Sequence, residues 1–243
     1  MIPQLQWALT LYEVLMKVSD VFTELVHGEL SAHAIAMMGS ISDTDTPRVI
    51  SYINSGLLAL YTRYPLLMKE LRLQQYSYIT SYKLSVEHAR TNSTSDKVKY
   101  IIDSNLSPFT GDVIRVEEVA DEVGDVLEIN SSDYDKVALL PSMDVIEIPN
   151  PTNTNVLFVT YRAKHPTLTS KDDDIILPMH MLTALYAYIG SRVYAGGTAA
   201  EHVSKTAELT NKYEMLCQQF ELQGMVNSDV QKINMRPELG GWI

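Results

Sequence analysis

Acidic side chains crowd one short stretch of the sequence, where paired carboxylates could transfer protons or hold a cation. Eight lie between residues 117 and 135: Glu117, Glu118, Asp121, Glu122, Asp125, Glu128, Asp133 and Asp135. Their spacing does not match a calcium loop, which needs oxygen ligands at alternate positions and a central glycine. Charged side chains usually remain in water, so the stretch can be a solvated surface. Alternatively, Glu117, Glu118, Asp121 and Glu122 form an acidic wall of a DNA channel, because like charge repels phosphate and lets DNA slide.

Other residues that often carry chemistry occur without the spacing that chemistry needs. The six histidines are scattered, and no two have a metal-pair spacing on one helix face. Cys217 is the only cysteine, which excludes an internal disulfide and predicts a small buried side chain. The sequence contains neither a glycine-rich phosphate loop nor a nucleophile elbow. We therefore expect no enzyme activity, no cofactor and no metal site.

The composition is that of a globular protein without a nucleic-acid-binding surface. Of 243 residues, 46% are hydrophobic and 20% are charged, which suits one large domain or two small ones. A net charge of -11 is unsuited to gripping phosphates, although such a protein can surround DNA without binding it. No apolar run is long enough for a membrane span, and the N-terminus lacks the basic segment of a secretory signal. We expect the chain to stay in the cytoplasm where it is made.

The elements that must position a site are clearest near the C-terminus. Helical periodicity predicts one helix from Pro178 to Tyr194 and a second over 199–223, separated by Gly196 and Gly197. Residues 172–224 are therefore predicted to form a helical hairpin. The predicted core stripes are Leu182, Leu185, Ile189 and Val193 in the first helix, and Val203, Ala207, Tyr213, Leu216 and Phe220 in the second. The aspartates at 172–174 would then precede a helix N-terminus, whose dipole favours negative charge.

The rest of the chain predicts a helical core interrupted by strands. Helical patterns cover residues 4–27 and 47–64. Alternation and turn residues predict strands at 76–84, 100–102, 113–119, 126–129, 137–140, 145–148 and 156–161. The predicted fold class is α+β, a helical bundle with a C-terminal helical hairpin, a β-rich insert and an extended C-terminal tail. The predicted domains are N-terminal helices at 1–66, the insert at 67–171, the hairpin at 172–224 and an arm at 225–243.

The C-terminal segment lacks periodicity and ends in Trp242 and Ile243. One interpretation is a frayed terminus. The other is an arm that docks on a neighbouring subunit or on a portal, with Arg236, Pro237, Trp242 and Ile243 at the contact, because an aromatic side chain is a good interface anchor.

Two stretches together resemble a known family. The first runs from Val49 to Leu66 and contains the step Ile53–Asn54 and the closing Tyr61-Thr62-Arg63-Tyr64. The second runs from Val156 to Leu168, with Tyr161–Arg162 and Pro166, and leads into the aspartate triplet, Leu177–Pro178 and the predicted hairpin. In this order they resemble the head-to-tail adaptor proteins of tailed bacteriophages. The likeness covers residues 47–223; the segment ahead of Asp43 and the strand predicted at 76–84 depart from the family pattern.

The resemblance implies a structural protein of the virion, located in the neck between capsid and tail. Such head-tail connectors form a ring, usually dodecameric, that docks under the portal, extends the DNA channel and offers a platform to tail or nozzle proteins. The implied partners are the portal protein, tail proteins and further copies of the chain, while double-stranded DNA passes through the lumen without specific binding.

Three other functions remain open. A tail-tube or tail-terminator ring belongs to the same class but should be mostly β, which the long helix patterns oppose. A cytoplasmic helical binding module would recruit a partner peptide. An enzyme would need a site assembled from distant parts of the chain, and no motif indicates one.

Overall fold

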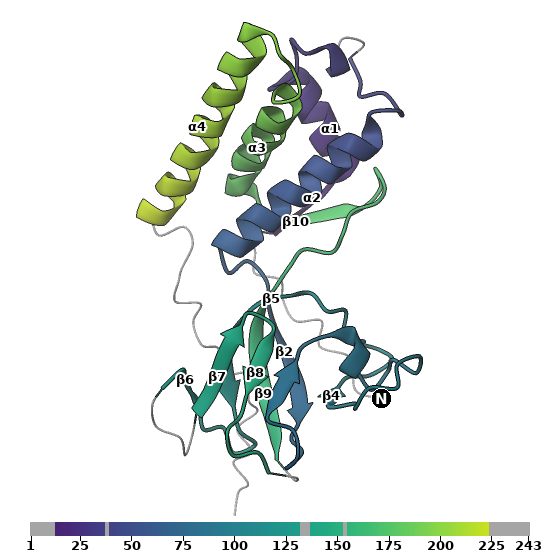
Figure 1. Cartoon of the computed structure of the whole chain (residues 1–243). Helices are drawn as coiled ribbons and strands as arrows, with labels where there is room; N and C mark the ends of the chain where they lie inside the picture. Colours follow the sequence, from purple (N-terminus) through teal and green to yellow (C-terminus); the bar gives the residue numbers. More distant parts are fainter. Residues whose placement is uncertain (1–12, 37–38, 132–136, 153–154, 224–243) are drawn as a thin grey trace, which may run out of the picture. The chain divides into compact units, whose positions relative to one another are not determined.

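The structure is a computed structural model that describes residues 13–36, 39–131, 137–152 and 155–223 (Figure 1). These residues form four α-helices and ten strands in three sheets. The chain divides into two compact units. The first comprises Met1–Gly56, Arg63–Pro65 and Leu168–Ile243, and the second comprises Leu57–Thr62 and Leu66–Thr167. Across the described helices, no segment combines the length and the hydropathy that a membrane crossing requires.

The first unit contains most of the helical residues. Its helices are α1 (Val18–His27), α2 (Thr46–Arg63, with 57–62 in the second unit), α3 (Leu182–Tyr194) and α4 (Ala200–Leu222), with short 3-10 turns η1 (Ala34–Ala36) and η3 (Met179–Met181). Helices α3 and α4 pack against each other (Figure 1). All four residues of the stripe predicted for α3 are buried. The buried residues of α4 are Leu209, Tyr213, Cys217 and Phe220.

A two-stranded antiparallel sheet joins the start of the described chain to the segment before α3. Strand β1 (Glu13–Lys17) pairs along its whole length with β10 (Asp174–Pro178). The continuous helix predicted from residue 4 is therefore wrong over 13–17; its residues 4–12 lie outside the described part. The helix predicted from Pro178 also begins later, at Leu182. Pairing between segments so distant in sequence leaves no signal in local periodicity.

The second unit is built from strands around one core. One sheet has the order β4-β2-β9-β5, from β2 (Met68–Gln74), β4 (Ile101–Ile102), β5 (Val113–Ala120) and β9 (Val156–Ala163). The other has the order β3-β8-β7-β6, from β3 (Ser81–Lys83), β6 (Glu128–Ile129), β7 (Val137–Ser142) and β8 (Val145–Glu147). A 3-10 turn, η2 (Val86–His88), precedes β4. Both sheets contribute to one hydrophobic cluster, which includes Leu73, Tyr82, Ile146, Leu157 and Val159.

These sheets correct the predicted fold class. The chain is α+β, but it is a β-rich protein with three sheets and not a helical bundle with a β-rich insert. The physical reason is that the eight strands of the second unit bury their apolar side chains in a hydrophobic core of their own. They are therefore not an addition to a core made of helices.

Candidate functional site

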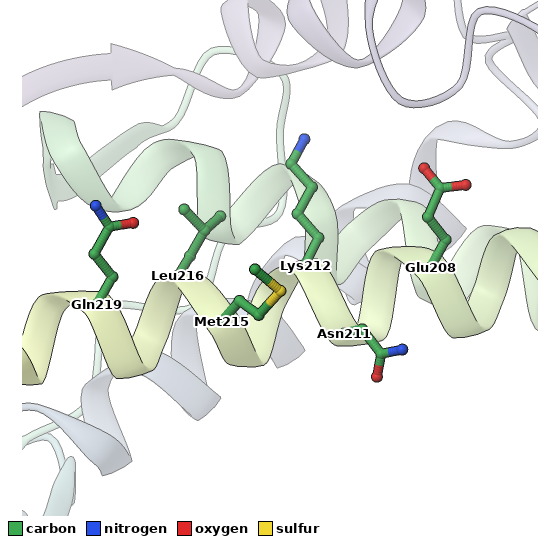
Figure 2. A pocket seen from close by; sticks show the side chains of 6 residues that line it. All are labelled: Glu208, Asn211, Lys212, Met215, Leu216 and Gln219. Atoms are coloured by element: carbon green, nitrogen blue, oxygen red, sulfur yellow. The ribbon is translucent and has the colours of Figure 1, made fainter.

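The outward side of α4 carries a shallow groove of about 430 Å³. Its described lining comes entirely from this helix: Glu208, Asn211, Lys212, Met215, Leu216 and Gln219. Figure 2 shows Glu208, Lys212, Leu216 and Gln219 along one side of the helix, with Asn211 pointing the other way. The spacing of these residues places them on neighbouring turns, where positions three and four apart share a face.

Two exposed apolar side chains lie on this surface. Met215 is 68% exposed and Leu222 88%. Helix α4 therefore buries one face and leaves Met215 and Leu222 in water on another, which defines its outer face; Val203, also exposed, lies roughly 120° around the helix from Met215. Flexible methionine side chains suit such contact surfaces because they adapt to the partner's shape.

The C-terminal half of α4 is anchored by Arg63, the last residue of α2, and by Tyr64, which follows it. The Arg63 guanidinium donates from Nη1 to Glu214 Oε2 at 2.9 Å and from Nε to Glu221 Oε1 at 2.8 Å. These hydrogen bonds raise the pKa of Arg63, so the charge is permanent. Tyr64 donates its hydroxyl to the Cys217 carbonyl at 3.0 Å, and burial raises the pKa of this phenol.

Two further contacts orient the groove. Lys212 Nζ lies 2.9 Å from Glu29 Oε1, which joins α4 to the turn after α1. Gly190 of α3 permits close approach of α4, since an added Cβ would lie 2.9 Å from the Leu209 Cδ1 atom. A second hollow of about 280 Å³ adjoins the groove and shares Glu208 and Lys212 with it. The arrangement presents one cation, one anion, two amides and an apolar centre, which suits recognition of a protein surface.

The sequence prediction placed two exposed residues of α4 in the core. Val203 and Ala207 were predicted to be buried, but both are exposed, whereas Leu209 and Cys217 are buried, with Leu209 beside Gly190 of α3. At 3.6 residues per turn, Val203 lies roughly 80° around the helix from Tyr213, so the two cannot share a narrow stripe. The steps of four, four and three that join Leu209, Tyr213, Cys217 and Phe220 were visible in the sequence and would have identified the correct face. Helix α4 begins without a side-chain cap: Ala199 is the N-cap residue, and no side chain forms a hydrogen bond there.

Several residues of the acidic stretch form ion pairs or hydrogen bonds within the second unit. Glu117 pairs with Arg162 at 2.7 Å, and Glu122 accepts a hydrogen bond from the Val156 amide at 2.5 Å. Asp121 Oδ1 accepts from the amides of Val123, Gly124 and Asp125 and so closes the turn after β5. Glu118 lies on β5 and also has an interaction partner. The structure thus places all four predicted wall residues along one edge of the second unit.

The remaining predicted site residues are not gathered at the groove. Arg236, Pro237, Trp242 and Ile243 lie outside the described residues. The aspartates at 172–174 do not precede a helix: Asp174 begins β10, and Asp173 Oδ2 accepts from the amides of Thr169 and Ser170 at 2.6 and 2.8 Å. These backbone hydrogen bonds lower the pKa of Asp173. The account based on a helix dipole is therefore wrong.

Two histidines and a tyrosine form an aromatic cluster near the α3–α4 connection. The rings of His33 and His202 are 5.3 Å apart, and both contact Tyr194. Burial, followed by the charge of His202, lowers the pKa of His33. Within the described ranges, no group of three His, Cys, Asp or Glu residues could hold a metal ion.

Comparison with known proteins adds no relative: no family model matches this chain, and no curated protein matches it either.

Proposed function

We propose that this chain is a structural protein of a tailed-phage virion, an adaptor that assembles as a ring between portal and tail. The observation that carries the proposal is the outer face of α4, a helix held by Arg63 and by the Lys212–Glu29 pair, on which the apolar side chains of Met215 and Leu222 remain in water. A monomer gains nothing from exposing such residues together, whereas a subunit that docks on other proteins covers them. The resemblance of residues 47–223 to head-to-tail adaptors supplies the identity of the partners.

In this role, α4 meets the portal or a neighbouring copy, and the channel formed by the ring passes double-stranded DNA without binding it. The net charge of -11 supports passage, because a negatively charged ring does not retain phosphate. The C-terminal residues Arg236, Pro237, Trp242 and Ile243 are proposed as a second contact.

The strand content favours a second candidate in the same class, a tail-tube or tail-terminator ring. Eight strands around one core are the kind of unit expected of such proteins, whereas the long helices α2 and α4 still oppose this candidate, as they did from sequence. The two candidates differ in partner. An adaptor binds a preformed portal ring, whereas a tube protein stacks on copies of itself.

The test is to mix the full chain with the purified portal of the same phage and to measure the mass of the complex by light scattering. An adaptor adds several copies to each portal ring. The double variant Met215→Glu and Leu222→Glu should weaken this binding by about tenfold or more, because it places charge in a desolvated contact. The matched control Thr210→Glu adds charge to an exposed position of α4 roughly 120–140° around the helix from Leu222 and Met215, and it should bind like the natural chain.

Electron microscopy of the chain alone separates the candidates. Stacked tubes in the absence of portal would favour the tail-tube function. A chain that neither assembles nor changes the portal's mass contradicts both.

A further inference from the structure

The groove on α4 gathers its lining side chains from one helix. In the described part of the chain, Glu208, Asn211, Lys212, Met215, Leu216 and Gln219 line it (Figure 2). Met215 is exposed and Leu216 is half-buried, so the apolar centre of the groove meets water, with charged and amide groups around it. A shallow surface of this kind suits a short segment of protein, whereas small molecules need enclosed pockets.

The chain leaves α4 at the rim of this surface. Helix α4 ends at Leu222, which lies on the same face as Met215 because seven residues make almost two full turns. The residues that follow change in character. Those at 227–232, which we call the linker, are polar apart from Val230. Those at 233–243, which we call the distal arm, include most of the apolar residues: Ile233, Met235, Leu239, Trp242 and Ile243.

The position of the distal arm along the chain places it beyond its own groove. Lys212 and Met215 at the centre of the groove lie about 12–17 Å along the helix axis from Gln223. An extended chain covers this distance in about five residues, so the polar linker would overlie the groove of its own copy. At Trp242 an extended chain can lie about 60 Å from Gln223, whereas α4 is only about 35 Å long. The apolar distal arm can therefore reach a surface on another copy.

The charges of the groove and of the distal arm match in spacing and in order. Glu208 and Lys212 are one turn apart, about 6 Å along the axis of α4. Arg236 and Glu238 would be about 6–7 Å apart on one side of an extended segment, because side chains alternate and each residue adds about 3.3 Å. Opposite charges therefore face each other when the distal arm runs parallel to α4.

This direction also decides which copy supplies the distal arm. With Glu238 beside Lys212, Trp242 falls about 13 Å further along the axis, on the apolar stretch between Met215 and Leu222. A chain that leaves α4 at its C-terminal end runs back along its own helix in the antiparallel direction. The parallel register therefore belongs to a distal arm from another copy.

We infer that the distal arm of one copy docks in the α4 groove of the next, with Trp242 against Met215 and Leu222. The groove charges already have partners in their own chain, so the added ion pairs fix the direction while the aromatic contact supplies most of the affinity. Contact between two different surfaces of identical chains is heterologous, and its repetition produces a closed ring or an open filament. The inference names the occupant of the α4 groove, and it rests on the proposed function only in expecting copies to assemble.

Cysteine cross-linking between full chains tests this contact, with and without the portal. One chain carries Ile243→Cys, which keeps Trp242 in place, and the other carries Gln219→Cys in the groove; the buried natural Cys217 is retained in both. Mild oxidation of the mixture should link one chain to the other. Thr210→Cys, an exposed position roughly 180° around α4 from Gln219, is the matched control and should link far less.

Sedimentation of the full chain measures the strength of association. Trp242→Ala should weaken association by about tenfold or more, because it removes the aromatic anchor. Trp7→Ala removes the other tryptophan of the chain and should leave association unchanged.

Charge reversal tests the register. Arg236→Glu and Glu208→Arg should each weaken association by about threefold, because like charges then face each other. The chain with both substitutions should recover most of the loss, since the two side chains are again of opposite charge.

Failure of this inference is distinguishable from failure of the proposed function. A chain that adds to the portal ring without any link between Ile243→Cys and Gln219→Cys copies overturns the arm contact and leaves the adaptor function standing. A link specific to Gln219→Cys, in a chain that does not bind the portal, supports the contact and removes the adaptor function.

Three other results would overturn the contact. The first is a link within a single dilute chain that carries both cysteines, because the distal arm then covers its own groove. The second is association that Trp7→Ala weakens and Trp242→Ala does not, which makes the N-terminal segment the occupant. The third is equal linking at Thr210→Cys, which shows contact without a specific site.

Discussion

Single residues in this protein act mostly through burial. Leu185 illustrates this, since its side chain is fully buried in the first unit and lies close to Gly56 of α2. An added Cβ on Gly56 would come within 2.7 Å of Leu185 Cδ1, so the two helices are in direct contact at this point.

Leu185→Ala should lower the free energy of unfolding by about 2–5 kcal/mol, because it removes buried methyl groups and leaves a cavity. Urea denaturation followed by circular dichroism measures the change. Leu222→Ala removes an equal number of atoms from an exposed position and should change stability by no more than about 0.5 kcal/mol. Equal effects of the two would mean that the buried face of α3 is assigned incorrectly.

Three histidines make stability depend on pH. Burial lowers the pKa of His33, His165 and His180 below the ordinary value of 6.5. The unfolded chain therefore takes up protons first as pH falls. Their contribution to stability is complete above about pH 6.5 and is lost as pH falls through 6.5 toward the folded values.

The free energy of unfolding should accordingly decrease between pH 7.5 and 5.5, as measured by urea denaturation at each pH. His165→Asn should flatten this decrease, since His165 is the most buried of the three. The substitution His27→Asn, at an exposed position, is the control. If His165→Asn leaves the pH dependence of the free energy of unfolding unchanged, other titratable groups cause the decrease.

At the level of elements, the position of α4 depends on a few polar contacts. Near its middle it contacts the turn after α1 through Lys212 and Glu29, and nearer its C-terminus it contacts Arg63 through Glu214 and Glu221. The two carboxylates that Arg63 binds, Glu214 and Glu221, are two turns apart on the helix. We call this pair of contacts the Arg63 fork, and because it holds α4 at two points it resists rotation of the helix about its axis.

Arg63→Gln should lower stability by about 1 kcal/mol, because two half-exposed ion pairs of roughly 0.2–1 kcal/mol each are lost. Amide hydrogen exchange in the second half of α4 should accelerate more than exchange in α3. Lys205→Gln removes a more exposed pair with Glu208 on the same helix and serves as the comparison. Uniform acceleration in both helices would show that the fork stabilises the unit without orienting α4.

The strands show how tertiary contacts overrule local patterns. The alternation over 76–84 predicts one long strand, yet only Ser81–Lys83 is a strand. The Tyr82 hydroxyl bonds to the amide and carbonyl of Tyr76 at 3.0 and 3.3 Å, so these tyrosines stabilise a turn. Conversely, Met68–Gln74 was not predicted, although Leu71 and Leu73 alternate with charged residues and face the core.

For the whole molecule, the C-terminal residues 233–243 offer a test that leaves the described helices and strands intact. Their removal should leave the unfolding transition unchanged and lower incorporation into particles, because an arm that contributes only to assembly adds no stability to the isolated chain. Quantitative mass spectrometry of purified particles measures incorporation. Removal of residues 239–243 alone tests whether Trp242 and Ile243 account for the effect, and unchanged incorporation after removal of residues 233–243 would remove the arm from the proposal.

The sequence by itself determined the features that depend on neighbours along the chain. These include the α2 and α3 periodicities, the burial of Cys217, most strand positions between 100 and 161, and the cluster of acidic residues at 117–128. Each is readable because helical and strand periods place nearby residues on one face.

Only the tertiary structure decided which segments pair across long distances. It joined β1 to β10, gathered eight strands around a core of their own, and turned α4 so that Met215 and Leu222 face water. Strand pairing and helix rotation are set by partners far away in sequence, so local spacing contains no record of them.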